Sequence, residues 1–503
     1  MECKTELLSL PEELLTYILS FLPWQDILRC TSLCKALRQI YMSSSELQYV
    51  TELGSQQLLP VSNDHIPVSE RLQLLRKNTR AWSKFDLRSL EIISIPETFQ
   101  IFTATYITNG HACFWNPFID SVRIFPILPK PSQQTIERNF SPGSLCLFPN
   151  HSNIDIFMDA AQNLLAIACA VRDDNYPSDE DSYIELLTLD GGSVHPQAAE
   201  PILFMSSLWL PRSRENFETP CSKLEGFGRH IAFLRFEPLF AGTDSLFAFK
   251  WWLDIWDWQH STSSNSILSG PIVLDLDYDR SPDFCFLGND RFLIISDDLK
   301  LYSIEDMSQS PQLLACFLLP ASVWDLQCFT PTNDIACNSH PKMQAQWISD
   351  PKHRLLSLVS HSSHLVFVIS TRVFFDDFID SEGILGVSGN RALYAFPAAG
   401  ATKDGHSVSS GYRLHLMDFS PSAVRRHQPG LGRLVNEPST IENCQSGEYL
   451  TTFLPYVEVA SDRTFSHGEF VEIWLDKDKI YLFRGNIDQL GVTRTNQLEV
   501  IEM

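Results

Sequence analysis

Residues that could do acid–base or metal chemistry are scattered along this chain of 503 residues. His361 and His364, with His353 upstream, form the densest local group of imidazoles, but their place on a polar turn is more typical of surface residues than of a metal site. Adjacent acids stand where strands are expected to end, and aspartate commonly closes turns there; these are Asp297-Asp298 and Asp376-Asp377. No Gly-x-Ser-x-Gly, Gly-x-x-x-x-Gly-Lys or His-Glu-x-x-His motif occurs. We therefore expect no catalytic centre, no metal and no cofactor.

The 12 cysteines are spread over the whole sequence. Cys30 and Cys34 are four residues apart, but no His or Cys pair nearby would complete a zinc site. Scattered cysteines are typical of buried free thiols in a reducing compartment. We expect no metal and no disulfide framework.

The charge balance excludes some classes of partner. Lys plus Arg is 38 and Asp plus Glu is 61, so the formal net charge is −23. An acidic chain is repelled by nucleic acid and by anionic membrane surfaces. No stretch approaches the roughly 18 uninterrupted apolar residues of a membrane span, and the N-terminus lacks a basic region followed by an apolar run. We expect a cytosolic or nuclear protein that binds neither nucleic acid nor membrane.

The first forty residues predict a cluster of short helices. Ser9 and Glu12 have the spacing of a capping box, Pro11 suits a first helical turn, and Pro23 should end the helix. The apolar residues then recur at helical spacing: Leu14, Leu15, Ile18, Leu19 and Leu22, followed by Ile27, Leu28, Leu33, Leu37 and Ile40. So small a unit cannot bury all of these side chains alone, so it either caps its own protein or binds a partner.

The order Leu-Pro-x-Glu-Leu, Ile-Leu, Leu, Asp-Ile-Leu and Leu-Cys-Lys over roughly residues 8 to 42 resembles an F-box. Leu37 stands where many members of that family carry Trp. The resemblance implies a substrate receptor of an SCF-type ubiquitin ligase that binds a Skp-family adaptor, and through it cullin and RING subunits. The adaptor-binding residues that it implies are Leu10, Pro11, Leu14, Ile18, Leu22, Ile27, Leu28 and Leu33.

Residues 65 to 88 predict a further helix. Leu72, Leu75 and Trp82 can share an apolar face, while Arg71, Arg76, Lys77, Arg80 and Lys84 decorate the rest. The basic side is either a contact patch or, more often in such helices, a solvated surface.

From about residue 90 the pattern becomes strand-like, with short runs rich in Val, Ile, Phe and Trp between turns. The apolar run Phe292–Ile295 is followed, after a polar turn, by a second strand-like run at Leu299–Ile304. Ile255-Trp256-Asp257-Trp258 has the Trp-Asp ending of propeller blades, and Val323–Leu326 resembles it in part. Without long helices between them, such strands indicate a propeller or a large sandwich. About six to eight blades of roughly 40–50 residues would fit.

The resemblance extends beyond the F-box. Segments 159–166, 187–192 and 255–258, with His195-Pro196, follow in the order of a large fungal group of F-box proteins with divergent propeller-like C-terminal regions.

Two charged segments could recognise a target: the acidic run Asp173–Asp181, and Arg425-Arg426-His427 with Arg433. Solvated loops that balance surface charge are the commoner explanation of both.

We therefore predict an α+β multidomain chain with a three-helix F-box at residues 1–48, a helical linker at 49–90 and an all-β, propeller-like domain of degenerate blades at 91–503. The F-box would bind the Skp-family adaptor, and the β-domain would hold a protein substrate that the sequence does not identify. Two alternatives remain, namely an F-box scaffold without ubiquitin transfer and a propeller enzyme with acids around a central channel.

Overall fold

The structure of the protein is a computed structural model. The described residues are 7–61, 66–85, 89–96, 99, 104–108, 110–116, 121–127, 136–140, 151–172, 180–191, 193–205, 222–239, 248–264, 266–273, 282–296, 298–318, 326–329, 347–360, 365–371, 386–388, 390–397, 412–425, 431–437, 439–442, 449–452, 455–465, 470–475, 479–487 and 493–503.

Short helices form the N-terminal unit, as the apolar spacing predicts. A 3-10 turn (Leu7–Ser9) precedes α1 (Glu12–Ser20), α2 (Trp24–Leu33), α3 (Lys35–Ser43) and α4 (Ser45–Ser55). The predicted capping box is wrong, because α1 begins behind Pro11, whose side chain cannot accept a capping hydrogen bond. Instead, the Glu12 carboxylate accepts a hydrogen bond from Ser43 Oγ at 2.6 Å, which ties the start of α1 to the end of α3.

Helix α4 is shared between two apolar clusters. Leu47 lies in the core of the N-terminal unit, with Leu15, Leu19, Ile27, Leu37 and Ile40. Tyr49 and Leu53 of the same helix pack against Leu72 and Leu75 of α5 (Val68–Lys84). The predicted apolar face of α5 is confirmed, since Leu72, Leu75 and Trp82 are all buried.

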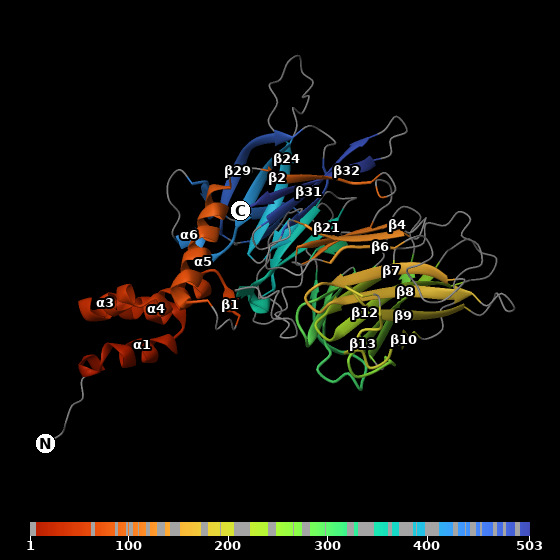
Figure 1. Ribbon diagram of the computed structural model, residues 1–503, viewed down its shortest axis with the longest axis horizontal. Coiled ribbons are helices and arrows are strands. Elements are labelled where there is room, and N and C mark those ends of the chain that lie inside the picture. Colours follow the sequence, from red (N-terminus) through yellow and green to blue (C-terminus); the bar gives the residue numbers. More distant parts are fainter. Residues whose placement is uncertain are drawn as a thin grey trace, which may run out of the picture.

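Seven antiparallel sheets follow the helices and form a propeller-like ring in the described part of the chain (Figure 1). The first sheet contains β3 (Ala104–Thr108), β4 (His111–Asn116), β5 (Ser121–Pro126) and β6 (Arg138–Phe140), and the second contains β7 (His151–Asp159), β8 (Leu164–Arg172), β9 (Glu180–Thr188) and β10 (Ile202–Phe204). The third contains β11 (Lys223–Phe227), β12 (His230–Leu239), β13 (Ala248–Asp257) and β14 (Ser266–Val273), and the fourth contains β15 (Asp283–Phe286), β16 (Arg291–Ile295), β17 (Asp298–Ser303) and β18 (Gln312–Leu318). The fifth contains β19 (Leu326–Phe329), β21 (Leu355–Ser360) and β22 (Leu365–Ser370), and the sixth contains β23 (Gly386–Ser388), β24 (Arg391–Pro397), β25 (Tyr412–Asp418), β29 (Tyr456–Phe465) and β26 (Arg433–Val435).

The seventh sheet closes the ring by joining the two ends of the propeller. It combines β30 (Phe470–Leu475), β31 (Lys479–Ile487) and β32 (Thr493–Glu502) with β2 (Ser89–Ser94), which pairs with β32. The ring is therefore closed by β2, the strand that directly follows α5. Two further two-stranded sheets are described outside the seven, β1 (Leu58–Pro60) with β20 (Trp347–Ser349) and β27 (Ser439–Glu442) with β28 (Tyr449–Thr452).

A separate apolar cluster fills each seam between neighbouring sheets, all the way around the ring. Ile124 and Ile156 meet between the first and second sheets, for example, and Phe114 and Phe483 meet between the first and seventh. The sandwich alternative is thereby excluded, because each sheet packs against two neighbours instead of one opposing layer. The predicted pairing of Phe292–Ile295 with Leu299–Ile304 is confirmed within the fourth sheet.

The helices attach to one face of the propeller. Since neighbouring strands are antiparallel, the connections after the first and the third strand of a sheet lie on the same face, and we call the face that holds Asp350, after β19, and Asn390, after β23, the linker face. On it, Asn390 Nδ2 donates to the Gln56 carbonyl at 3.2 Å, and Asp350 N donates to the Gln57 carbonyl at 3.0 Å. Trp82 and Phe85 also enter the cluster between the sixth and seventh sheets. The helical unit is thus fixed to the fifth, sixth and seventh sheets.

None of the described helices has the length and hydropathy needed to cross a bilayer. Cys30 and Cys34 are free thiols, and both are half-buried instead of buried. Among the described residues, no group of His, Cys, Asp or Glu side chains is arranged to hold a metal ion.

Candidate adaptor-binding surface

An apolar stripe runs along the outer side of α1. Leu14, Tyr17, Ile18 and Phe21 are 49%, 62%, 41% and 69% exposed, and their spacing of three, one and three residues keeps them on one side of the helix. Leu15 and Leu19, on the opposite side, are buried in the core. The helix therefore has two apolar sides, and only one of them is covered by this chain.

The outer stripe contains an aromatic pair. The rings of Tyr17 and Phe21 meet edge to face, with centroids 4.8 Å apart. Further exposed apolar side chains of the same unit are Leu8, Leu33 and Met42. Grouped exposed apolar side chains mark a surface that another protein covers, because their contact with water is unfavourable. Aromatic anchors are also the side chains that dominate the free energy of protein association.

The structure distributes the residues that the F-box resemblance implies over three environments. Pro11, Leu14, Ile18 and Leu33 are exposed. Leu10, Leu22 and Leu28 are half-buried, and the first two of them pack against the core of the unit.

Ile27 is the exception among the implied contact residues. It is only 1% exposed and belongs to the core, so its assignment to the contact surface is corrected to a supporting role beneath that surface. The pattern of α2 places Ile27 on the side that faces α1 and α4, and the sequence alone did not distinguish the two sides.

Sequence reasoning missed Tyr17 and Phe21. A signal was available, because positions 14, 17, 18 and 21 form one side of a helix, whereas positions 15, 19 and 22 form the other. The predicted set took one member, Leu22, from the side that the structure turns towards the core.

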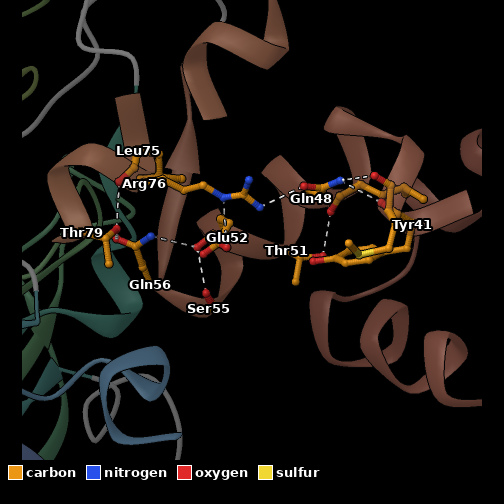
Figure 2. A network of polar contacts seen from close by, with 11 residues as sticks. Tyr41, Gln48, Thr51, Glu52, Ser55, Gln56, Leu75, Arg76 and Thr79 are labelled. Carbon is orange, nitrogen blue, oxygen red and sulfur yellow. Dashed lines mark hydrogen bonds and ion pairs between the residues drawn. The ribbon is translucent and has the colours of Figure 1, made fainter. Parts of the chain in front are cut away.

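A polar network behind this surface joins the N-terminal unit to α5 (Figure 2). Gln48 Nε2 donates to the carbonyls of Tyr41 and Met42, at the end of α3, and its Oε1 accepts from Arg76 Nη2 at 3.0 Å. Arg76 also lies 3.6 Å from the Glu52 carboxylate. Further along, Thr79 Oγ1 donates to Gln56 Oε1 at 3.1 Å. The network therefore joins α3 and α4, against which α1 packs, to α5.

A direct contact also links this unit to the propeller. The Arg425 guanidinium, in α6 (Pro421–Arg425) on the linker face, lies 5.4 Å from the centroid of the Trp24 ring. The same ring rests on Gly54, where an added Cβ would lie 2.4 Å from Trp24 Cδ1. Arg425, for which the sequence left target recognition and the balance of surface charge as alternatives, contacts the helical unit of its own chain. Arg426 and His427 lie outside the described residues.

The other polar groups singled out in the sequence are structural or undescribed. His353 Nδ1 pairs with Asp350 Oδ2 at 2.9 Å in a short 3-10 turn. His361, His364, Asp297, Asp376-Asp377, residues 173–179 and residues 323–325 lie outside the described part of the chain.

The propeller motifs of the sequence converge on one seam, between the second and third sheets. Gln162 Nε2 donates to Asp159 Oδ2 and to the Gly228 carbonyl, both at 2.8 Å, and Trp258 Nε1 donates to the same carbonyl at 3.1 Å. His195 packs edge to face on Trp258 and contacts the Gln162 carbonyl through Nε2 at 3.0 Å. Burial raises the pKa of Asp159 and lowers that of His195. The contacts of these residues hold the second and third sheets together, and this structural role explains their positions without any catalytic function.

Carboxylates on the first strands of the sheets serve the same purpose. Asp155 accepts hydrogen bonds from Tyr106 Oη at 2.8 Å and from Leu224 N at 2.7 Å, which joins three successive sheets. Burial raises its pKa to about 6. Asp283 repeats the arrangement by accepting from Lys223 Nζ and from Cys328 N, both at 2.7 Å. The propeller-enzyme alternative gains no support from these acids, since each is engaged in bonds between sheets.

Comparison with known proteins agrees with the N-terminal assignment. A family model described as F-box-like matches residues 7–47, the range that carries α1, α2 and α3. No curated protein matches the chain.

Several solved structures are similar to the chain at low identity. Puromycin hydrolase is 13% identical, with a TM-score of 0.32 over 70% of this chain and 49% of that one. The acylaminoacyl peptidase of Pyrococcus horikoshii is 8% identical, with a TM-score of 0.34 over 80% and 51%. AztD from Citrobacter koseri is 9% identical, with a TM-score of 0.31 over 79% and 85%. The chain spans about half the length of the two hydrolases, and likenesses this distant imply nothing about its activity.

The structure and the family comparison together identify two domains in the described part of the chain. Residues 7–47 are an F-box-like domain, and the chain joins that domain through α4 and α5 to a seven-bladed propeller-like domain.

Proposed function

We propose that this protein is the substrate-recognition subunit of an SCF-type ubiquitin ligase. Its F-box-like domain would bind a Skp-family adaptor, which would connect it to cullin and RING subunits. The propeller would hold a target protein near the ubiquitin-charged enzyme and so raise the effective concentration of the two reactants. The observation that carries this proposal is the exposed stripe of Leu14, Tyr17, Ile18 and Phe21 on α1 of the F-box-like domain.

Adaptor binding is the first measurement that tests the proposal. Truncation of Leu14 or Ile18 to Ala is expected to weaken the adaptor complex by about 1–3 kcal/mol each, which is roughly 5- to 150-fold in Kd. The combined variant L14A/I18A/F21A should not co-purify with the adaptor. Because these side chains are exposed in the free protein, the variant should keep the thermal stability of the parent.

A matched control changes exposed polar residues of the same helices. Glu13, Gln25 and Gln39 are exposed, and the variant E13A/Q25A/Q39A should retain the complex. Equal adaptor affinity of the stripe variant and the parent would show that the stripe is not the contact surface. An adaptor complex that recruits no cullin would instead favour the scaffold alternative without ubiquitin transfer.

A further inference from the structure

Helix α5 carries a strip of basic side chains on its exposed side. Lys77, Arg80 and Lys84 are all exposed and follow one another at spacings of three and four residues, so they lie along one side of the helix. The opposite side, with Leu72, Leu75 and Trp82, is buried. The strip therefore faces away from the protein.

These three cations differ from the other basic residues of α5. Arg71 lies over the Tyr49 ring at 5.3 Å from its centroid, and Arg76 pairs with Glu52 and Gln48. Lys77, Arg80 and Lys84 form no ion pair within 4.0 Å with any acid among the described residues. Within the described part of the chain, therefore, no acid pairs with these three cations, although the chain as a whole has a net charge of −23.

The stability of α5 does not account for this arrangement. Like charges three or four residues apart repel and destabilise a helix, and Arg80 has Lys77 on one side and Lys84 on the other. A solvated helix surface usually alternates acids and bases along such rows. The helix dipole favours a cation in the last turn, which applies to Lys84 but not to Lys77, two turns earlier.

We propose that the strip of Lys77, Arg80 and Lys84 binds an acidic segment of a partner protein. Carboxylates laid along the strip would relieve the repulsion between the three cations. Leu74, one turn before Lys77 and 37% exposed, offers an apolar contact at the end of the strip. A nucleic acid is disfavoured, because its extended phosphate chain would meet the net negative charge of the rest of the protein. This site is separate from the apolar stripe on α1 and does not depend on adaptor binding.

The test uses the full-length chain without any adaptor and a short fluorescent peptide that is rich in glutamate and carries one leucine. Fluorescence anisotropy should show saturable binding to the parent protein. The charge-reversal variant K77E/R80E/K84E should bind the peptide about tenfold more weakly or worse. Raising the ionic strength from about 0.1 M to about 1 M shortens the screening length from about 10 Å to about 3 Å and should abolish the difference between the two proteins.

Two further variants control for net charge and for folding. K35E/R38E/K352E reverses three exposed cations that lie outside α5 and makes the same change in net charge, so it should bind the peptide like the parent. K77Q/R80Q/K84Q removes the charges without adding acids to the helix, and it should also lose the peptide. The proposal is overturned if the parent shows no saturable binding, if both triple reversals weaken binding equally, or if an oligonucleotide of equal charge binds the strip more tightly than the peptide.

Discussion

The seam between the sixth and seventh sheets contains a buried carboxylate that lies between two guanidinium groups. The Glu499 side chain, on β32, is completely buried and accepts hydrogen bonds from both Arg463 on β29 and Arg484 on β31. Arg463 Nη2 lies 3.0 Å from Glu499 Oε2, and Arg463 Nη1 contacts Oε1. The pairing therefore connects the sixth sheet to the seventh, next to the cluster that receives Trp82 and Phe85. We predict that Glu499→Gln loosens this seam.

The expected loss follows from the burial of the three groups. Removing one partner of a buried ion pair costs about 3–5 kcal/mol, because the remaining charge is left without compensation. The arginine side chains are 32% and 21% exposed, so water screens part of that cost and places it at the lower end of this range. The unfolding entropy of about 2 cal/mol/K per residue gives a propeller of this size a shift of about 1 °C per kcal/mol. We expect the Tm to fall by about 3–5 °C.

Thermal unfolding at neutral pH, followed by circular dichroism, measures this effect. Glu502 is exposed on the same strand, so Glu502→Gln removes an equal charge and should leave the Tm within about 1 °C of the parent. Replacing all three partners by apolar residues, as in R463M/R484M/E499L, should recover most of the loss, because no buried charge then remains. A Tm of Glu499→Gln equal to that of Glu502→Gln would refute the reasoning.

Two further predictions concern the helical unit and pH. Gly54→Ala should destabilise the protein by about 1–2 kcal/mol in chemical denaturation, because the new Cβ displaces Trp24 despite the better helix propensity of alanine; unchanged or higher stability would contradict the packing. His230 is buried beside Phe286, close to Arg229, Asp257 and Asp290, and its pKa is lowered to about 4 by burial. The imidazole is protonated near pH 6.5 in the unfolded chain but not in the folded protein. Between pH 7 and pH 5, the free energy of unfolding should therefore fall by about 2 kcal/mol more in the parent than in His230→Phe. Parallel pH profiles of the two proteins would refute this prediction.

The sequence determined the elements that depend on local patterning. Helical spacing of apolar residues predicted the F-box helices and the buried face of α5, and short apolar runs between turns, such as Phe292–Ile295, predicted the paired strands. Both patterns follow from the geometry of a single element and need no knowledge of the rest of the fold. The order of motifs around α1 also indicated the F-box-like domain that the family comparison matches.

Only the tertiary structure decided which of the apolar sides of these elements are covered. Ile27 and Phe21 are both apolar residues at helical positions, but one lies in the core and the other faces solvent, since that outcome depends on where α1, α2 and α4 meet. The same holds for the pairing of β2 with β32, which brings together the strand that follows α5 and the last described strand of the chain. Such contacts depend on the closure of the whole ring, and no local periodicity encodes them.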